Sequence, residues 1–171
     1  MTDMLQRQMR HDVWATEQLI AHVRRFTAAQ LELTAVGTYG SIRKTLVHIV
    51  GADEGYLVRL LGEKLHEAHF TNLDADLDEI ATHLGHVKDG VERLFARGPL
   101  DGDREITDTP LRRSEQPRFE TAAWVPAAQF VYHGVDHRSQ IDTILSTHGL
   151  ETIDLQVWPY ATELGATRQG K

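Results

Sequence analysis

Phe130-Val-Tyr-His133-Gly-Val-Asp-His137-Arg-Ser-Gln-Ile141 carries two histidines at i and i+4, with apolar residues before and after them. This spacing stacks both imidazoles on one face of a helix. Apolar side chains, including Ile144 one turn further on, occupy the same face. The stretch therefore predicts an amphipathic helix whose two histidines point at a core rather than at water.

Apolar residues at three-and-four spacing recur along most of the chain, which is typical of helices. We expect long helices at about residues 3–30, 41–62, 74–97 and 125–148, and a short C-terminal segment at 153–164. Ser41 is a suitable N-cap and Gly62 a suitable stop for the second helix. The pattern predicts an all-α fold, a four-helix bundle within one domain that spans residues 1–171.

Residues 98–124 interrupt this pattern with three prolines and a polar composition. Short extended pieces are expected at 104–107 and 118–122. A connection this long is uncommon in a compact domain and is often functional. We expect it to be a lid over a site or a wall of one.

Composition excludes several classes of protein. The 171 residues include no cysteine, which rules out disulfides, thiolate metal sites and a cysteine nucleophile and suits a reducing, cytoplasmic location. The formal net charge is −7 with scattered basic residues, so no nucleic-acid partner is expected. No apolar run approaches the roughly 20 residues of a membrane span, and we expect neither a signal peptide nor a membrane partner.

A third histidine, His48, lies in the apolar pattern of the second expected helix and is followed by small residues at i+3, i+4 and i+7. Small side chains leave room there for a ligand or for another helix. Neutral imidazole is a common ligand of divalent metals, and one shared cation would satisfy three buried rings. His48, His133 and His137 are therefore the predicted ligands of one divalent metal (Zn, Ni, Fe or Mn). Hydrogen-bonded core histidines are the alternative.

Two further histidine pairs have i, i+3 spacing. His66 and His69 follow the helix-stopping Gly62, and His83 and His86 lie beside the apolar stripe of the third helix. We therefore expect all four on the solvated surface. The His-Glu-x-x-His motif of common metalloproteases is absent.

The order and spacing of several stretches resemble the DinB/YfiT-like family. Val131–Ile141 is similar to the family's last-helix signature His-x-x-x-His-Arg-x-Gln-Ile, and Leu46–Val50 resembles its second-helix ligand segment. His11–Leu19 and Ile153–Tyr160 are similar to its opening helix and its ending. The resemblance implies an up-down-down-up four-helix bundle, a homodimer, and one divalent metal on the three histidines named above.

Characterised relatives of this kind include transferases and an isomerase that use mycothiol or bacillithiol. The resemblance thus favours a metal-dependent enzyme that transfers a low-molecular-weight thiol to a small electrophilic substrate. Because the chain has no cysteine, the sulfur would come from that thiol co-substrate. Two alternatives remain: a hydrolase that uses metal-activated water on a small ester or amide, and a non-catalytic metal-binding stress-response protein.

Supporting residues can be named only as candidates. Asp12, Asp136 and Gln140 could orient the ligating histidines, because carboxylates and carbonyls usually fill that role. Asp136 lies one step around the helix from His137, so we do not expect it to be a ligand itself. The candidates to bind the carboxylate of a thiol cofactor are Arg112, Arg113, Arg118 and Arg138.

Overall fold

The computed structural model describes residues 4–66, 70–107 and 120–167. The described residues are predominantly helical, which confirms the predicted helical class. They form α1 (Met4–Val23), α2 (Ala28–Leu31), α3 (Ile42–Leu61), α4 (Leu77–Ala96), α5 (Trp124–Thr147) and α6 (Val157–Glu163), with strands β1 (Glu105–Thr107) and β2 (Glu120–Ala122). None of the helices described is long and apolar enough to cross a membrane.

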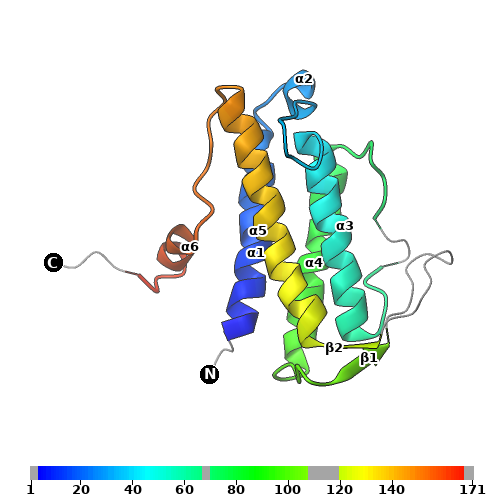
Figure 1. The fold of residues 1–171 in the computed structure, drawn as a ribbon. Helices are drawn as coiled ribbons and strands as arrows, with labels where there is room; N and C mark the ends of the chain where they lie inside the picture. Colours follow the sequence, from blue (N-terminus) through cyan, green and yellow to red (C-terminus); the bar gives the residue numbers. More distant parts are fainter. Residues whose placement is uncertain (1–3, 67–69, 108–119, 168–171) are drawn as a thin grey trace.

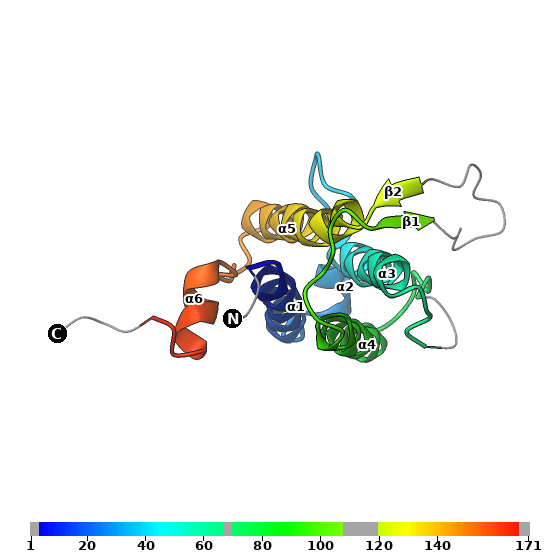
Figure 2. The ribbon, with the colours of Figure 1, turned by 90° about the horizontal axis from the view of Figure 1, so that it is seen from below.

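The long helices α1, α3, α4 and α5 lie side by side (Figure 1). Helix α3 packs against both α4 and α5, and α1 packs against the same two helices, as the view along the helix axes also shows (Figure 2). Helices α1 and α5 run in one direction, whereas α3 and α4 run in the other (Figure 1). Because α3 lies between α4 and α5, it can present one set of side chains to each of them.

Local capping sets where these helices begin and end. The Ser41 hydroxyl accepts a hydrogen bond from the Lys44 amide at 3.3 Å, so Ser41 is the N-cap of α3 as expected. Gly62 ends α3 in the left-handed conformation, with φ at 73°, which glycine adopts without steric cost. Asp76 caps α4 by accepting from the two backbone amides that follow Leu77.

The first expected helix, residues 3–30, is wrong as one continuous element. Helix α1 ends at Val23, and a capping box between Thr27 and Gln30 starts the separate helix α2. A capping residue competes with the helix that precedes it because its hydroxyl binds the amides of a new first turn. The Thr-x-x-Gln pattern indicates the start of a new helix, but the apolar periodicity continues across it and favoured one continuous helix.

The connection between α4 and α5 contains the extended pieces expected there. Strands β1 and β2 pair antiparallel, with Ile106 opposite Thr121, and Ile106 is buried. Residues 108–119, the middle of the predicted lid or wall, lie outside the described part of the chain.

A buried ion pair joins α1 to α5. The Arg138 guanidinium donates to the Asp12 carboxylate at 2.5 Å and to the Thr16 hydroxyl at 2.9 Å. Asp12 is fully buried and Arg138 is 5% exposed. Gly134, one turn before Arg138, makes room for this contact, because a Cβ there would lie 2.4 Å from the Asp12 Oδ1 atom.

We expect Gly134→Ala to destabilise the protein by about 1–3 kcal/mol, the usual cost of overpacking a core. Gly85→Ala is the matched control, because nothing lies within 4 Å of a Cβ at that position of α4. It should stabilise by about 0.5–1 kcal/mol through helix propensity. Urea unfolding of both variants measures the difference, and equal stabilities would contradict the packing described.

Candidate metal centre

His48 of α3 meets His133 and His137 of α5. The packing of the two helices brings the Nε2 atoms of His48 and His133 to 3.0 Å. One ring nitrogen from each of the three histidines lies within 4.8 Å of the others, and all three side chains are half-buried. The i, i+4 pair and the separately predicted His48 are therefore brought together, in an arrangement that one cation can span.

Gln140 determines which nitrogen of His137 is free. The Gln140 Oε1 atom lies 3.0 Å from Nδ1 of His137 and accepts the Tyr39 amide at 3.0 Å. Since a carbonyl oxygen only accepts, Nδ1 of His137 carries the proton and Nε2 is left as a ligand. The predicted orienting role is thus supported for Gln140.

Aromatic rings pack around the other two histidines. The Tyr39 ring stacks on His48 with ring centroids 4.0 Å apart, and the Tyr56 ring meets His133 edge-on at 5.7 Å. Burial lowers the pKa of His48, and the nearby His137 lowers it further. Burial, with the charges of His137, His48 and Arg138, lowers the pKa of His133 to about 4. These two imidazoles are neutral near pH 7, which is the form that binds a metal.

His133 has one polar atom without a hydrogen bond. Its Nδ1 atom is buried and has no partner among the residues that the structure describes. Its Nε2 atom faces His48. The Nε2 atoms of His48 and His133 face each other, and either can present a lone pair. This arrangement is better suited to binding a shared cation than to packing in an apolar core.

A cleft of about 340 Å³ opens beside His48. Its floor is the row of small residues on α3, Gly51, Ala52 and Gly55, and Tyr56 and Phe70 are among its walls. Glycine is required at 51, because a Cβ there would lie 2.7 Å from the Phe70 carbonyl oxygen. The small residues thus allow the close contact with Phe70 and leave space for a ligand.

A larger hollow of about 670 Å³ lies between α5 and residues 152–158, and it contains none of the three clustered histidines. We place the site at the smaller cleft, because His48 lines it and the rings of His133 and His137 lie against His48.

Two predicted supporting residues have another role. Asp12 contacts Arg138 rather than a clustered histidine, so its predicted orienting role is wrong. Arg138 is buried in that same ion pair, so its guanidinium is already paired with a carboxylate of the chain. Asp136 is exposed to solvent. The remaining cofactor-binding candidates, Arg112, Arg113 and Arg118, lie outside the described residues.

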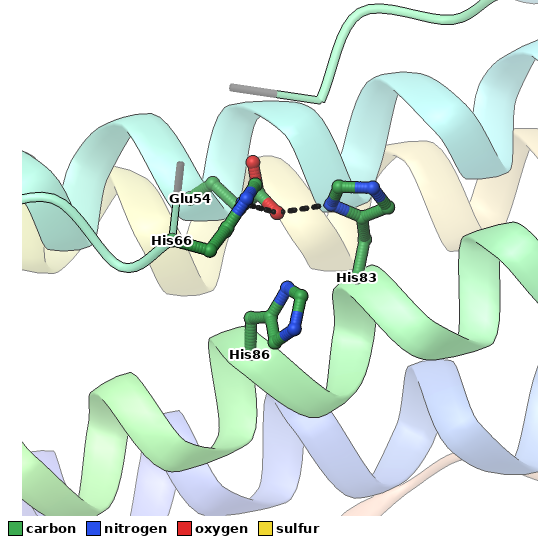
Figure 3. A group of neighbouring side chains, drawn as sticks. All are labelled: Glu54, His66, His83 and His86. Carbon is green, nitrogen blue, oxygen red and sulfur yellow. Dashed lines mark hydrogen bonds and ion pairs between the residues drawn. The ribbon is translucent and has the colours of Figure 1, made fainter. Parts of the chain in front are cut away.

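The expectation of solvated surface is wrong for His66, His83 and His86. These three half-buried histidines surround the buried carboxylate of Glu54 (Figure 3), and His69 lies outside the described residues. The sequence contained one signal, the adjacent acidic residues Asp53 and Glu54 within the apolar pattern of α3. A buried carboxylate requires partners, but the pattern does not say which ones.

The model that describes the DinB family matches residues 1–163 of the chain. The match includes both histidine clusters. The comparison with curated proteins finds no match.

We expect His133 to make the metal-free protein less stable in acid. Its pKa of about 4 in the folded chain lies below the unfolded value of about 6.5, so the unfolded chain binds the additional proton and stability falls as pH decreases from about 6.5 to 4. In His133→Ala, the free energy of unfolding should fall by about 1–2 kcal/mol less over this pH range than in the wild type. This value is reduced because the ring is partly exposed to solvent.

Denaturant unfolding at about pH 7 and about pH 4.5 measures the effect. The exposed His148, whose Nε2 lies 2.9 Å from the Thr34 carbonyl oxygen, provides the control variant His148→Ala. An unchanged pH dependence in His133→Ala would contradict the burial argument.

Proposed function

The chain belongs to the DinB family, and on that premise we propose that it is a metal-dependent enzyme whose divalent cation is held by His48, His133 and His137. The observation that carries the proposal is the meeting of three half-buried imidazoles beside a cleft. The paired helix directions described above support the family's up-down-down-up bundle.

The donor set fits such a cation. Three imidazole nitrogens suit zinc, nickel or iron, and three protein ligands leave a coordination position for substrate. The lowered pKa values of His48 and His133 support the same assignment. A cation bound there supplies Lewis-acid chemistry, either by stabilising a thiolate or by lowering the pKa of water.

The protein's own residues position and enclose the reactants. Gln140 holds His137 and the Tyr39 backbone together, and the Tyr39 ring covers His48. Burial raises the pKa of Tyr56, so its phenol stays protonated and can donate a hydrogen bond to a molecule in the cleft. Small apolar floor residues leave space for a compact substrate.

The reaction we propose is transfer of a low-molecular-weight thiol to a small electrophile. The chain supplies no cysteine, so a sulfur nucleophile must enter with a co-substrate. The cleft of about 340 Å³ lies at the lower end of the range for small-molecule sites, which suits a small electrophile. Hydrolysis by metal-activated water is the competing reaction that an assay must separate.

We also propose that two copies associate. Five large apolar side chains on α5 and α6 are at least half exposed: Trp124, Tyr132, Val135, Val157 and Trp158. Val135, Val157 and Trp158 line the same hollow. Clustered exposed apolar side chains are typical of protein–protein contacts, which supports the homodimer implied by the family resemblance.

Metal content tests the three-histidine site. We expect His133→Ala/His137→Ala to lose one equivalent of divalent metal relative to the wild type, as measured by elemental analysis without a histidine tag. Gln140→Ala should weaken metal binding about 10–100-fold, because it releases the proton-bearing side of His137. The neighbouring exposed residue provides the control, Ser139→Ala. Equal metal content in wild type and double variant would overturn the assignment.

Thiol dependence tests the reaction. A panel of small electrophiles should react only when both the metal-loaded protein and an added thiol such as mycothiol or bacillithiol are present. With the His133→Ala/His137→Ala protein, the rate should equal that of the uncatalysed mixture. Turnover in thiol-free buffer would overturn thiol transfer and favour hydrolysis.

A further inference from the structure

Glu54 is a buried carboxylate on α3, 1% exposed. Its Oε1 atom lies 2.7 Å from Nε2 of His66 and 2.7 Å from Nδ1 of His83. Its Oε2 atom accepts the Phe70 amide at 2.9 Å. One oxygen is therefore held by the backbone, while the other faces two imidazoles whose side chains are each 17% exposed.

His86 completes the group without a hydrogen bond to it. Its ring lies 4.5 Å from His66 and 5.4 Å from His83, measured between centroids. Its Nδ1 atom is buried and has no hydrogen-bond partner among the described residues. Figure 3 shows the ring of His86 on α4, beside the carboxylate and the other two imidazoles. Hydrogen bonds thus account for three members of the cluster and leave the fourth unsatisfied.

We propose that Glu54, His66, His83 and His86 form a second metal site, which binds Zn²⁺. Each residue offers one ligand atom, and the four atoms lie within 4.8 Å of one another. Three imidazoles and one carboxylate are a tetrahedral zinc donor set. The site would be closed, because all four positions belong to the protein.

The geometry requires only small movements. Bonds of about 2.0–2.1 Å place tetrahedral ligand atoms about 3.3 Å apart. The two contacts at 2.7 Å to Glu54 would open by about 0.6 Å, and His86 would move inward to ligate. The Phe70 amide fixes the orientation of the carboxylate, as groups behind metal ligands commonly do.

The site would have a structural role. Its ligands come from α3, from the connection that follows it, and from α4, so one cation would tie three segments together. Phe70 lies between the two clusters: its ring stacks on His83 at 4.1 Å, and it lines the cleft beside His48. Zinc at the second site would therefore hold one wall of that cleft.

This proposal does not depend on the three-histidine site or on the reaction proposed there. Glu54 and His48 lie about 120° apart around α3, given about 100° per residue. Substitutions on α5 leave the four residues of the second cluster unchanged. Each site can therefore be removed while the other is measured.

The test measures zinc binding by the His133→Ala/His137→Ala protein. The protein is first treated with a chelator, and zinc is then titrated into it by isothermal titration calorimetry. We expect one Zn²⁺ per chain, and a higher melting temperature with zinc than without it. In the same background, Glu54→Gln and His86→Ala should each weaken zinc binding about 100-fold or more. His148→Ala in that background is the control and should bind like its parent.

Glu54→Gln preserves the size of the side chain and an oxygen acceptor, and His86→Ala removes no hydrogen bond at Nδ1, so circular dichroism should show folded variants. No zinc bound by folded His133→Ala/His137→Ala would overturn the proposal. Equal affinity in both the Glu54→Gln and His86→Ala proteins would overturn it too. One zinc per chain retained in the α5 double variant and lost with His86→Ala supports the second site, whatever the wild type binds at the first.

Discussion

The ion pair between Asp12 and Arg138 is the constraint on which the arrangement of α5 depends. Both charges are buried, and separating them would leave an uncompensated charge in the core. Gly134 lets α1 approach closely enough for the contact. Once this face of α5 is held against α1, the neighbouring face, which carries His133 and His137, must turn towards α3. The rotation of one helix is therefore set by a polar contact away from the cleft.

Helix α3 is the element shared by both histidine clusters. It contacts α5 on one side and α4 on the other, so His48 and Glu54 serve different partners although they are six residues apart. The connection after α3 folds back over it, and Phe70 contacts both regions. A change at either cluster is therefore expected to reach the cleft through this segment.

Much of the fold could be predicted from the chain alone. Helical class followed from apolar spacing, and Ser41 and Gly62 act at the ends of α3 as their chemistry predicts. The break after Val23 was missed because apolar periodicity continues across it. The grouping of His48 with the α5 pair was predicted from the place of His48 in an apolar helix pattern beside small residues, and the family resemblance named the same three histidines.

What the sequence by itself determined is local: the helices, their caps, and the face on which His133 and His137 lie, all set by interactions within a few residues. What only the tertiary structure decided are the contacts between distant residues. The sequence made Arg138 a candidate to bind a cofactor, but the folded chain pairs it with Asp12. Their spacing predicted that His66, His83 and His86 lie on the surface, but the folded chain brings them to Glu54. Spacing reports which face of a helix a side chain occupies, but burial and charge pairing depend on what packs against that face.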